Sequence, residues 1–127
     1  MTSAIACGAL LAVAVATASA AGAQPAPAGD ATRGATLFEA RCASCHVARG
    51  GGQGPSLVGV FGRKAAAAPA FRYSPALARS GLTWTAANLD RFLAGPGKLV
   101  PGAAMLIVIA NGAQRADLIQ YLATQTR

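Results

Sequence analysis

Two kinds of side chain are scarce in this sequence of 127 residues: it has one histidine, His46, and four acidic residues. A structural zinc site needs three or four Cys or His ligands, and beyond the N-terminal apolar segment only Cys42, Cys45 and His46 are present. The acids show no pairing that suggests acid–base catalysis. They are Asp30, Glu39, Asp90 and Asp117. The chain is therefore not expected to hold structural zinc or to be an enzyme.

Aromatic residues are also few, at 6% of the chain, and the 54% hydrophobic content is inflated by alanine. A domain of roughly 100 residues with so little aromatic volume has a thin core. Basic residues outnumber acidic ones by eleven to four, which gives a net charge of +7. Such a charge can indicate nucleic-acid binding, but no basic helix with interleaved aromatic residues is present, which argues against nucleic acid.

The most informative stretch is Cys42-Ala43-Ser44-Cys45-His46. Two cysteines separated by two residues and followed by histidine form the c-type haem attachment pattern. The thiols add to the two vinyl groups at one edge of the haem, and His46 can then reach the iron from the proximal side. A redox dithiol would normally accompany a βαβ pattern, which is absent, and a disulfide or partial metal site explains less. We therefore predict one covalent haem c, which would also supply the missing apolar volume.

The N-terminal segment has the pattern of a secretory signal peptide. Residues 4–20 are almost continuously apolar, and Ala18-Ser19-Ala20 and Ala21-Gly22-Ala23 both fit an A-x-A cleavage site. We expect residues 1–23 to be a signal peptide that is cut after Ala20 or Ala23. Residues 24–29 should form a Pro/Ala linker, and residues 30–127 should form one domain. Because the leader contains no Lys or Arg, its retention as a membrane anchor is the alternative. Export to the bacterial periplasm agrees with covalent haem attachment.

Helix signals dominate the rest of the chain, so the expected fold class is all-α. Asp30 is a suitable N-cap for a helix that runs through Arg41. Inside it, Gly34 indicates the close approach of another element, since glycine is unfavourable within a helix. Glycine and proline interrupt residues 47–74, which predicts a long irregular loop. Such a loop is reasonable if it wraps a cofactor.

Three further helices are expected beyond this loop. Ser74 and Pro75 are suited to the N-cap and first position of a short helix that ends near Gly81. Another helix should run over residues 85–94 and stop at Gly95-Pro96. Pro101-Gly102 favours a type II turn, and an apolar stripe predicts a last helix over residues 112–125.

Taken together, these motifs resemble class I cytochrome c, close to the mitochondrial and bacterial cytochrome c2 branch, from Asp30 to Thr124. Besides the haem motif, the resemblance rests on segments that match in order and spacing. They are Gly54-Pro55, Gly62-Arg63-Lys64, Phe71-x-Tyr73-Ser74, Leu82-Thr83-Trp84, Pro101-Gly102-Ala103-Ala104-Met105 and Arg115-x-Asp117-Leu118-Ile119-x-Tyr121-Leu122. The resemblance implies the small cytochrome c fold, all-α, with about four helices and long loops around the haem.

The resemblance also implies roles for particular residues. The Pro55 carbonyl would orient His46, and Met105 would be the distal iron ligand. Counting favours the same assignment, because Met1 is the chain's only other methionine. Three side chains would hold a haem propionate: Arg63, Tyr73 and Trp84. The alternative is that Tyr73 and Trp84 are ordinary core aromatics and that Arg63 is a solvated surface charge. The first and last helices would cross where Gly34 and Phe38 meet Leu118 and Tyr121.

Iron held by His46 and Met105 would have no open position, which predicts a soluble, monomeric one-electron carrier. Its expected partners are redox proteins with acidic docking surfaces: a cytochrome bc1-type donor and an oxidase or reaction-centre acceptor. If Met105 does not bind the iron, the alternative is a five-coordinate haem protein that binds gases or acts as a weak peroxidase. If the leader is retained, the chain is instead a membrane-tethered cytochrome subunit.

Several positions depart from the family pattern. Phe92 stands where tyrosine is usual, Ala103 where threonine is frequent, Leu77 where asparagine is frequent, and Ile107 where phenylalanine is found. These departures remove hydrogen-bonding groups from around the methionine and the inner propionate. The lysine ring of the mitochondrial proteins is also sparse, because only two lysines are present.

Overall fold

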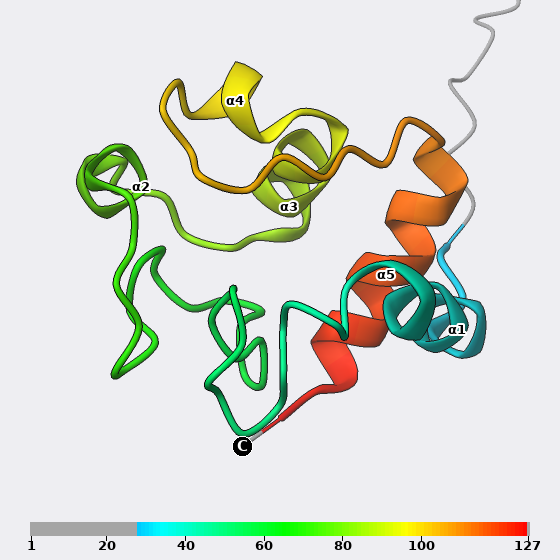
Figure 1. Cartoon of the computed structure of the whole chain (residues 1–127). Coiled ribbons are helices and arrows are strands. Elements are labelled where there is room, and N and C mark those ends of the chain that lie inside the picture. The colour runs from blue at the N-terminus through cyan, green and yellow to red at the C-terminus, as the bar shows by residue number, and fades with distance from the viewer. Residues whose placement is uncertain (1–27, 127) are drawn as a thin grey trace, which may run out of the picture.

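The structure, a computed structural model, describes residues 28–126. The expected signal peptide at residues 1–23, and most of the expected linker at residues 24–29, lie outside this part. Within it there are five helices and no strands: α1 (Ala31–Arg41), α2 (Pro75–Arg79), α3 (Ala86–Ala94), α4 (Pro96–Leu99) and α5 (Gly112–Thr124) (Figure 1). The predicted all-α class is confirmed. None of the helices in this range is long and apolar enough to cross a membrane.

Helix starts follow the capping residues in the sequence. The Asp30 side chain accepts a hydrogen bond from Arg33 N at 2.8 Å, and Ser74 accepts one from Leu77 N at 3.2 Å. Thr85 caps α3 in the same way, and Asn111 caps α5. Each cap satisfies an N–H group that the first turn leaves without an intrahelical partner. The predicted helices over residues 31–41, 85–94 and 112–125 are therefore confirmed to within one residue at each end.

The helix α4 corrects the expected count of about four helices. Gly95-Pro96 does end α3, and Gly95 adopts an extended backbone with φ of 174°. The chain then re-enters a helical turn with Pro96 at its start, a position where the missing proline N–H costs no hydrogen bond. After α4, Gly102 has a φ of 90°, as the third residue of a type II turn requires.

The first and last helices cross at Gly34, as the sequence suggested. Gly34 is buried, and a Cβ added to it would overlap the backbone carbonyl of Asp117 and meet Cβ of Tyr121. Next to this contact, the rings of Phe38 and Tyr121 pack with their centroids 5.1 Å apart. The backbones of α1 and α5 can approach this closely only because residue 34 has no side chain.

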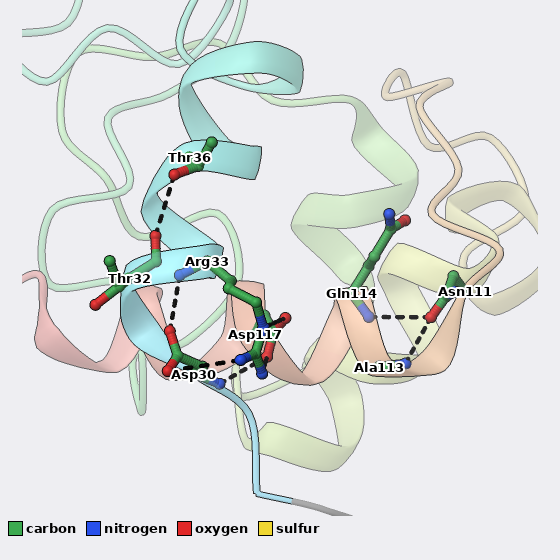
Figure 2. Close-up of polar contacts among 8 residues, drawn as sticks. All are labelled: Asp30, Thr32, Arg33, Thr36, Asn111, Ala113, Gln114 and Asp117. Atoms are coloured by element: carbon green, nitrogen blue, oxygen red, sulfur yellow. Dashed lines mark hydrogen bonds and ion pairs between the residues drawn. The ribbon is translucent and has the colours of Figure 1, made fainter.

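A buried carboxylate ties the start of α1 to the middle of α5 (Figure 2). Asp117 is 7% exposed, and its oxygens accept hydrogen bonds from Arg33 Nε at 2.8 Å, Arg33 Nη2 at 2.9 Å and Asp30 N at 2.6 Å. The hydrogen bonds from Arg33, followed by the one from the Asp30 backbone, hold the pKa of Asp117 below its usual range. The charge is fully partnered, so its burial does not leave an uncompensated ion.

The apolar core lies between α3 and α5. Leu118 is 1% exposed and packs in one cluster with Leu122 of α5 and with Leu89, Phe92 and Leu93 of α3. Trp84, from the loop before α3, joins this cluster through an edge contact with Phe92, with ring centroids 4.9 Å apart. The loops, rather than further helices, close the other side.

Charge is divided unevenly along the described chain. Residues 40–89 contain six basic residues and no acidic one, whereas residues 28–39 and 90–126 together contain four of each. The whole net charge of the described residues therefore comes from the segment that runs from the end of α1 through the long loops and α2 to the start of α3. Most of this segment lies to the left of the α1/α5 crossing in Figure 1.

Candidate functional site

A cavity of about 530 Å³ lies between the α3/α5 core and the long loops, within the roughly 300–1,000 Å³ of cofactor pockets. It is lined mainly by apolar side chains. All eight residues singled out in the sequence line this one cavity: Cys42, Cys45, His46, Pro55, Arg63, Tyr73, Trp84 and Met105. Residues more than 60 positions apart in the sequence thus meet around a single hollow.

The haem motif continues directly from the end of α1. A turn closes over it, because the N–H groups of Cys45 and His46 both donate to the Cys42 carbonyl, at 3.1 and 2.8 Å. His46 Nδ1 lies 2.8 Å from the Pro55 carbonyl oxygen, the contact that the resemblance implied. A carbonyl can only accept, so Nδ1 carries the proton and Nε2 keeps its lone pair. The imidazole is therefore held in the tautomer that a metal ligand needs.

Two glycines fit closely around this turn. A Cβ at Gly54 would lie 2.5 Å from Cε1 and 2.7 Å from Nδ1 of the His46 ring, and one at Gly52 would overlap the Cys45 carbonyl. The Gly54 N–H also donates to that carbonyl at 3.0 Å. In the sequence, Gly52 indicated only a loop, and Gly54 indicated a loop and formed part of the family pattern. Their packing role was missed, since nothing local shows that the loop folds back onto the haem motif.

Neither Cys42 nor Cys45 forms a disulfide with another described residue, and the two differ in exposure. Cys42 is buried, and Cys45 is half-buried. Burial raises the pKa of the Cys42 thiol, an effect that the nearby Arg41 charge partly opposes. Cys42 is thus held as a neutral sulfur, a form that fits an apolar cavity.

The side chain of Arg63 is half-buried rather than a solvated surface charge. It donates through Nη1 to the Val58 carbonyl at 3.1 Å and through Nη2 to the Ser56 carbonyl at 3.3 Å. Its Nε is buried without a hydrogen-bond partner among the described residues. A buried guanidinium nitrogen without an acceptor is costly, so this site lacks a negatively charged or polar partner.

A strained loop presents Tyr73 to the cavity. Ala66 and Ala70 have left-handed backbones, with φ of 59° and 58°, which costs a non-glycine residue about 1–2 kcal/mol. Between them, Ala68 N–H donates to the Tyr73 hydroxyl oxygen at 3.1 Å. This bond uses only a lone pair of the oxygen, so the hydroxyl hydrogen remains available to donate. Nothing in the sequence predicted this strain.

The polar and apolar side chains that line the cavity come largely from different parts of the sequence. Its charged and hydroxyl-bearing side chains all come from residues 41–74. The lining residues from 77 onward are apolar except for the Trp84 indole and the Met105 thioether, and they include all four positions that depart from the family pattern: Leu77, Phe92, Ala103 and Ile107. The lining residues that accompany Met105 in this later part of the chain are therefore almost all apolar.

Met105 lies in the segment 100–111, which joins α4 to α5 and is called here the Met105 strap. Met105 is half-buried and packs against the core cluster. The three residues after it are apolar yet exposed: Leu106 at 85%, Ile107 at 41% and Val108 at 47%. The strap thus presents one thioether to the cavity and a short apolar surface to solvent.

Comparison with known proteins agrees with the haem site that these residues suggest. A family model described as cytochrome c matches residues 31–126. This chain belongs to the cytochrome c family, as a class I member. It is 44% identical to cytochrome c of Chlamydomonas reinhardtii over 80% of this chain and 94% of that protein. It is 43% identical to cytochrome c2 of Rhodomicrobium vannielii over 77% and 81% of the two chains.

A solved structure shows the same fold. Cytochrome cH from Methylobacterium extorquens superposes with a TM-score of 0.72 at 43% identity, over 76% of this chain and 99% of that one. Members of the cytochrome c family are haem proteins that transfer electrons and are not enzymes. The predicted haem c cofactor and the predicted absence of enzyme activity both follow from family membership.

The residues of the cavity fit a c-type haem. Its apolar walls suit a macrocycle, two thiols and an oriented imidazole lie at one place on its lining, and a thioether lies on a separate segment. The orphaned Arg63 Nε lacks the kind of acceptor that a propionate offers. None of the four acidic side chains lines the cavity, so no carboxylate opposes a bound propionate there.

Proposed function

We propose that this chain is a soluble one-electron carrier whose haem is attached through Cys42 and Cys45, with His46 and Met105 as the two axial iron ligands. The observation that carries the proposal is the 2.8 Å contact from His46 Nδ1 to the Pro55 carbonyl, in a cavity that both thiols and Met105 also line. That contact leaves Nε2 as the only lone pair of the imidazole. Orientation of this kind typically accompanies histidine that binds a metal.

Haem bound in this way supplies one-electron redox chemistry, and a soft methionine ligand favours the reduced state. If His46 and Met105 both bind the iron, no coordination position would be left for a substrate. His46 Nδ1–H donates its hydrogen bond to the Pro55 carbonyl oxygen, which fixes the plane of the ring. The apolar walls from residues 77–122 exclude water from the Met105 side, which limits the rearrangement that a change of charge would otherwise require.

Three further side chains are assigned to a haem propionate. Arg63 offers its unpartnered Nε, and Tyr73 offers its hydroxyl hydrogen, which the bond from Ala68 N leaves available. Trp84 offers its indole N–H from the wall of the same cavity. Charge-assisted hydrogen bonds to a carboxylate are about twice as strong as neutral ones. The strain at Ala66 and Ala70 is then offset by the contact that it makes possible.

We further propose that the carrier works in the bacterial periplasm after removal of residues 1–23, as a monomer. Its partners would be a cytochrome bc1-type donor and an oxidase or reaction-centre acceptor with acidic docking surfaces. The cation-only segment 40–89 supports this choice, since opposite charge speeds the encounter between proteins. The relation to a bacterial cytochrome c2 supports the compartment. Finding the native protein in the membrane fraction would favour a tethered subunit instead.

Haem attachment is tested by denaturing the holoprotein and extracting it with acidified organic solvent. The colour should stay with the polypeptide if Cys42 and Cys45 form thioether bonds. Replacing both cysteines by serine should abolish the coloured protein, and the remaining chain should be largely unfolded because its own side chains leave the cavity open. Complete extraction of the haem from the wild type would contradict the assignment.

Axial ligation is tested by the absorption spectrum of the oxidised protein near neutral pH. A methionine–iron bond gives a weak far-red band and a low-spin spectrum, and Met105→Ala should remove the band and lower the reduction potential. A high-spin wild type, or a Met105→Ala variant with an unchanged spectrum, would exclude this ligand and favour the five-coordinate alternative. The same measurement thus separates the electron carrier from a gas-binding protein.

A further inference from the structure

The Met105 strap is anchored at its two ends and loose between them. At its start, Val100 N donates to the Pro96 carbonyl at 2.8 Å and Ala103 N to the Val100 carbonyl at 2.9 Å. Residues 104–108 form no backbone–backbone hydrogen bond within the described chain, and all of them except Met105 are exposed. A segment of this kind has few interactions that resist displacement. Its position therefore depends on the anchors.

The far anchor is built by α3 and α5 together. Ile109 is 2% exposed, and its N–H donates to the Leu93 carbonyl of α3 at 2.8 Å. From α5, Arg115 Nη1 donates to the carbonyls of Ile109 and Ala110, at 2.9 and 2.8 Å. Arg115 Nε also donates to Asp90 Oδ1 of α3 at 2.7 Å, with the Arg115 side chain only 15% exposed. One guanidinium thus joins both helices to the end of the strap.

We propose that Arg115 and Asp90 are positioning residues for Met105: they clamp the end of the strap four residues downstream and thereby set how readily the thioether leaves its place. This inference rests on the proposed function, since it requires Met105 to bind the iron. Asp90 accepts from Arg115 Nε and so fixes the orientation of the guanidinium group. Nη1 of the same group then donates to the two carbonyls of the strap. Lysine has no such fork and cannot make these contacts together.

The consequence is a measurable opening equilibrium. An external ligand can take the position of Met105 only in molecules whose strap has moved away. Its apparent dissociation constant therefore equals the intrinsic one divided by the fraction of open molecules. Weakening the clamp should raise that fraction, and apparent affinity should rise by the same factor.

The test is a titration of the oxidised holoprotein with imidazole, buffered above the pKa of imidazole, in which loss of the far-red methionine band reports displacement. Arg115→Ala should tighten apparent imidazole binding about tenfold or more, because charge-assisted bonds are lost. Arg115→Lys should recover only part of the wild-type resistance. Asp90→Asn, which keeps the size of the side chain, should have a smaller effect in the same direction and serves if Arg115→Ala does not fold.

The matched control is Arg33→Ala. It removes two hydrogen bonds of similar length from α5, at the crossing with α1 rather than at the strap. It should lower global stability without changing imidazole affinity. Combining Arg115→Lys with Met105→Ala should also leave imidazole affinity at the value of Met105→Ala alone, because there is then no thioether to displace.

Three results would contradict the clamp proposal or the ligation on which it rests. If Arg115 variants lose stability but bind imidazole as the wild type does, the clamp is merely structural and the inference is overturned. If Arg33→Ala shifts imidazole binding as much as Arg115→Ala, the effect is global and the inference is likewise overturned. If the wild type has no far-red band and binds imidazole without displacement, the proposed ligation fails, and this outcome is distinct from the other two.

Discussion

The α1/α5 crossing and the Met105 strap are built on the same helix and held by different means. At the crossing, backbone lies against backbone at Gly34, and a carboxylate with three donors joins the two helices. In the strap, five consecutive residues have no backbone–backbone hydrogen bond in the described chain, and a side chain of α5 holds one end. We conclude that stability is concentrated at the crossing, while the element that provides the proposed ligand is free to adjust.

The largest expected contrast is between two leucines, one in each region. Leu118 is 1% exposed in the core beside the crossing, whereas Leu106 in the strap is 85% exposed. Leu118→Ala should lower the free energy of unfolding by about 2–5 kcal/mol through lost burial and a new cavity. Leu106→Ala should change it by less than about 0.5 kcal/mol. Denaturant unfolding of the holoprotein measures both, and similar losses at the two positions would remove the contrast.

A smaller effect is expected from adding a single methyl group at the crossing. Gly34→Ala places a Cβ onto the Asp117 carbonyl, and we expect it to lower the free energy of unfolding by about 1–3 kcal/mol, as overpacking does. Gly97→Ala is the matched control, because a Cβ there meets no atom within 4 Å. The control should keep the wild-type unfolding midpoint or raise it slightly, because alanine is favoured over glycine within a helix. Equal midpoints for the two variants would mean that the helices are not held in backbone contact.

The smallest effect should appear only in acid. Arg33 and the Asp30 N–H hold the pKa of Asp117 low in the folded protein, while in the unfolded chain it is about 3.9. The resulting stabilisation is present above about pH 4 and is lost as the pH falls through the lower folded value. Asp117→Asn should therefore reduce stability at neutral pH and flatten its decline in acid. A decline as steep as that of the wild type would assign the acid sensitivity to other carboxylates.

Much of the fold could be predicted because its signals are local. Asp30, Ser74 and Thr85 lie next to the groups that they cap, so the sequence contains both partners of each bond. The helix α4 was missed for a local reason too, since Gly95-Pro96 ends one helix and permits another to begin. The close approach at Gly34 was predicted from the cost of glycine in a helix, although its partner on α5 came only from the resemblance.

The same difference between local and long-range signals applies to the site. The attachment motif is five adjacent residues, and its meaning is visible in the sequence, while the proposed roles of Arg63, Tyr73, Trp84 and Met105 came from a family pattern. Contacts over long separations had no signal of their own. Arg33 and Asp117 are 84 positions apart in the sequence, and Asp90 and Arg115 are 25 positions apart, so no local pattern predicts either pairing. The left-handed alanines were also missed, because alanine ordinarily avoids that conformation.

The cation-only segment 40–89 has a consequence for the molecule as a whole. Because all the net charge of the described residues lies in this segment, from the end of α1 to the start of α3, while the rest of the described chain is balanced, we expect the described part of the protein to have a permanent electric dipole. Such a molecule turns in an external field before it touches anything. On a carboxylate-coated electrode we expect it to adsorb with its loops toward the surface and the α1/α5 crossing toward the solution. An adsorbed film would then have one orientation rather than many.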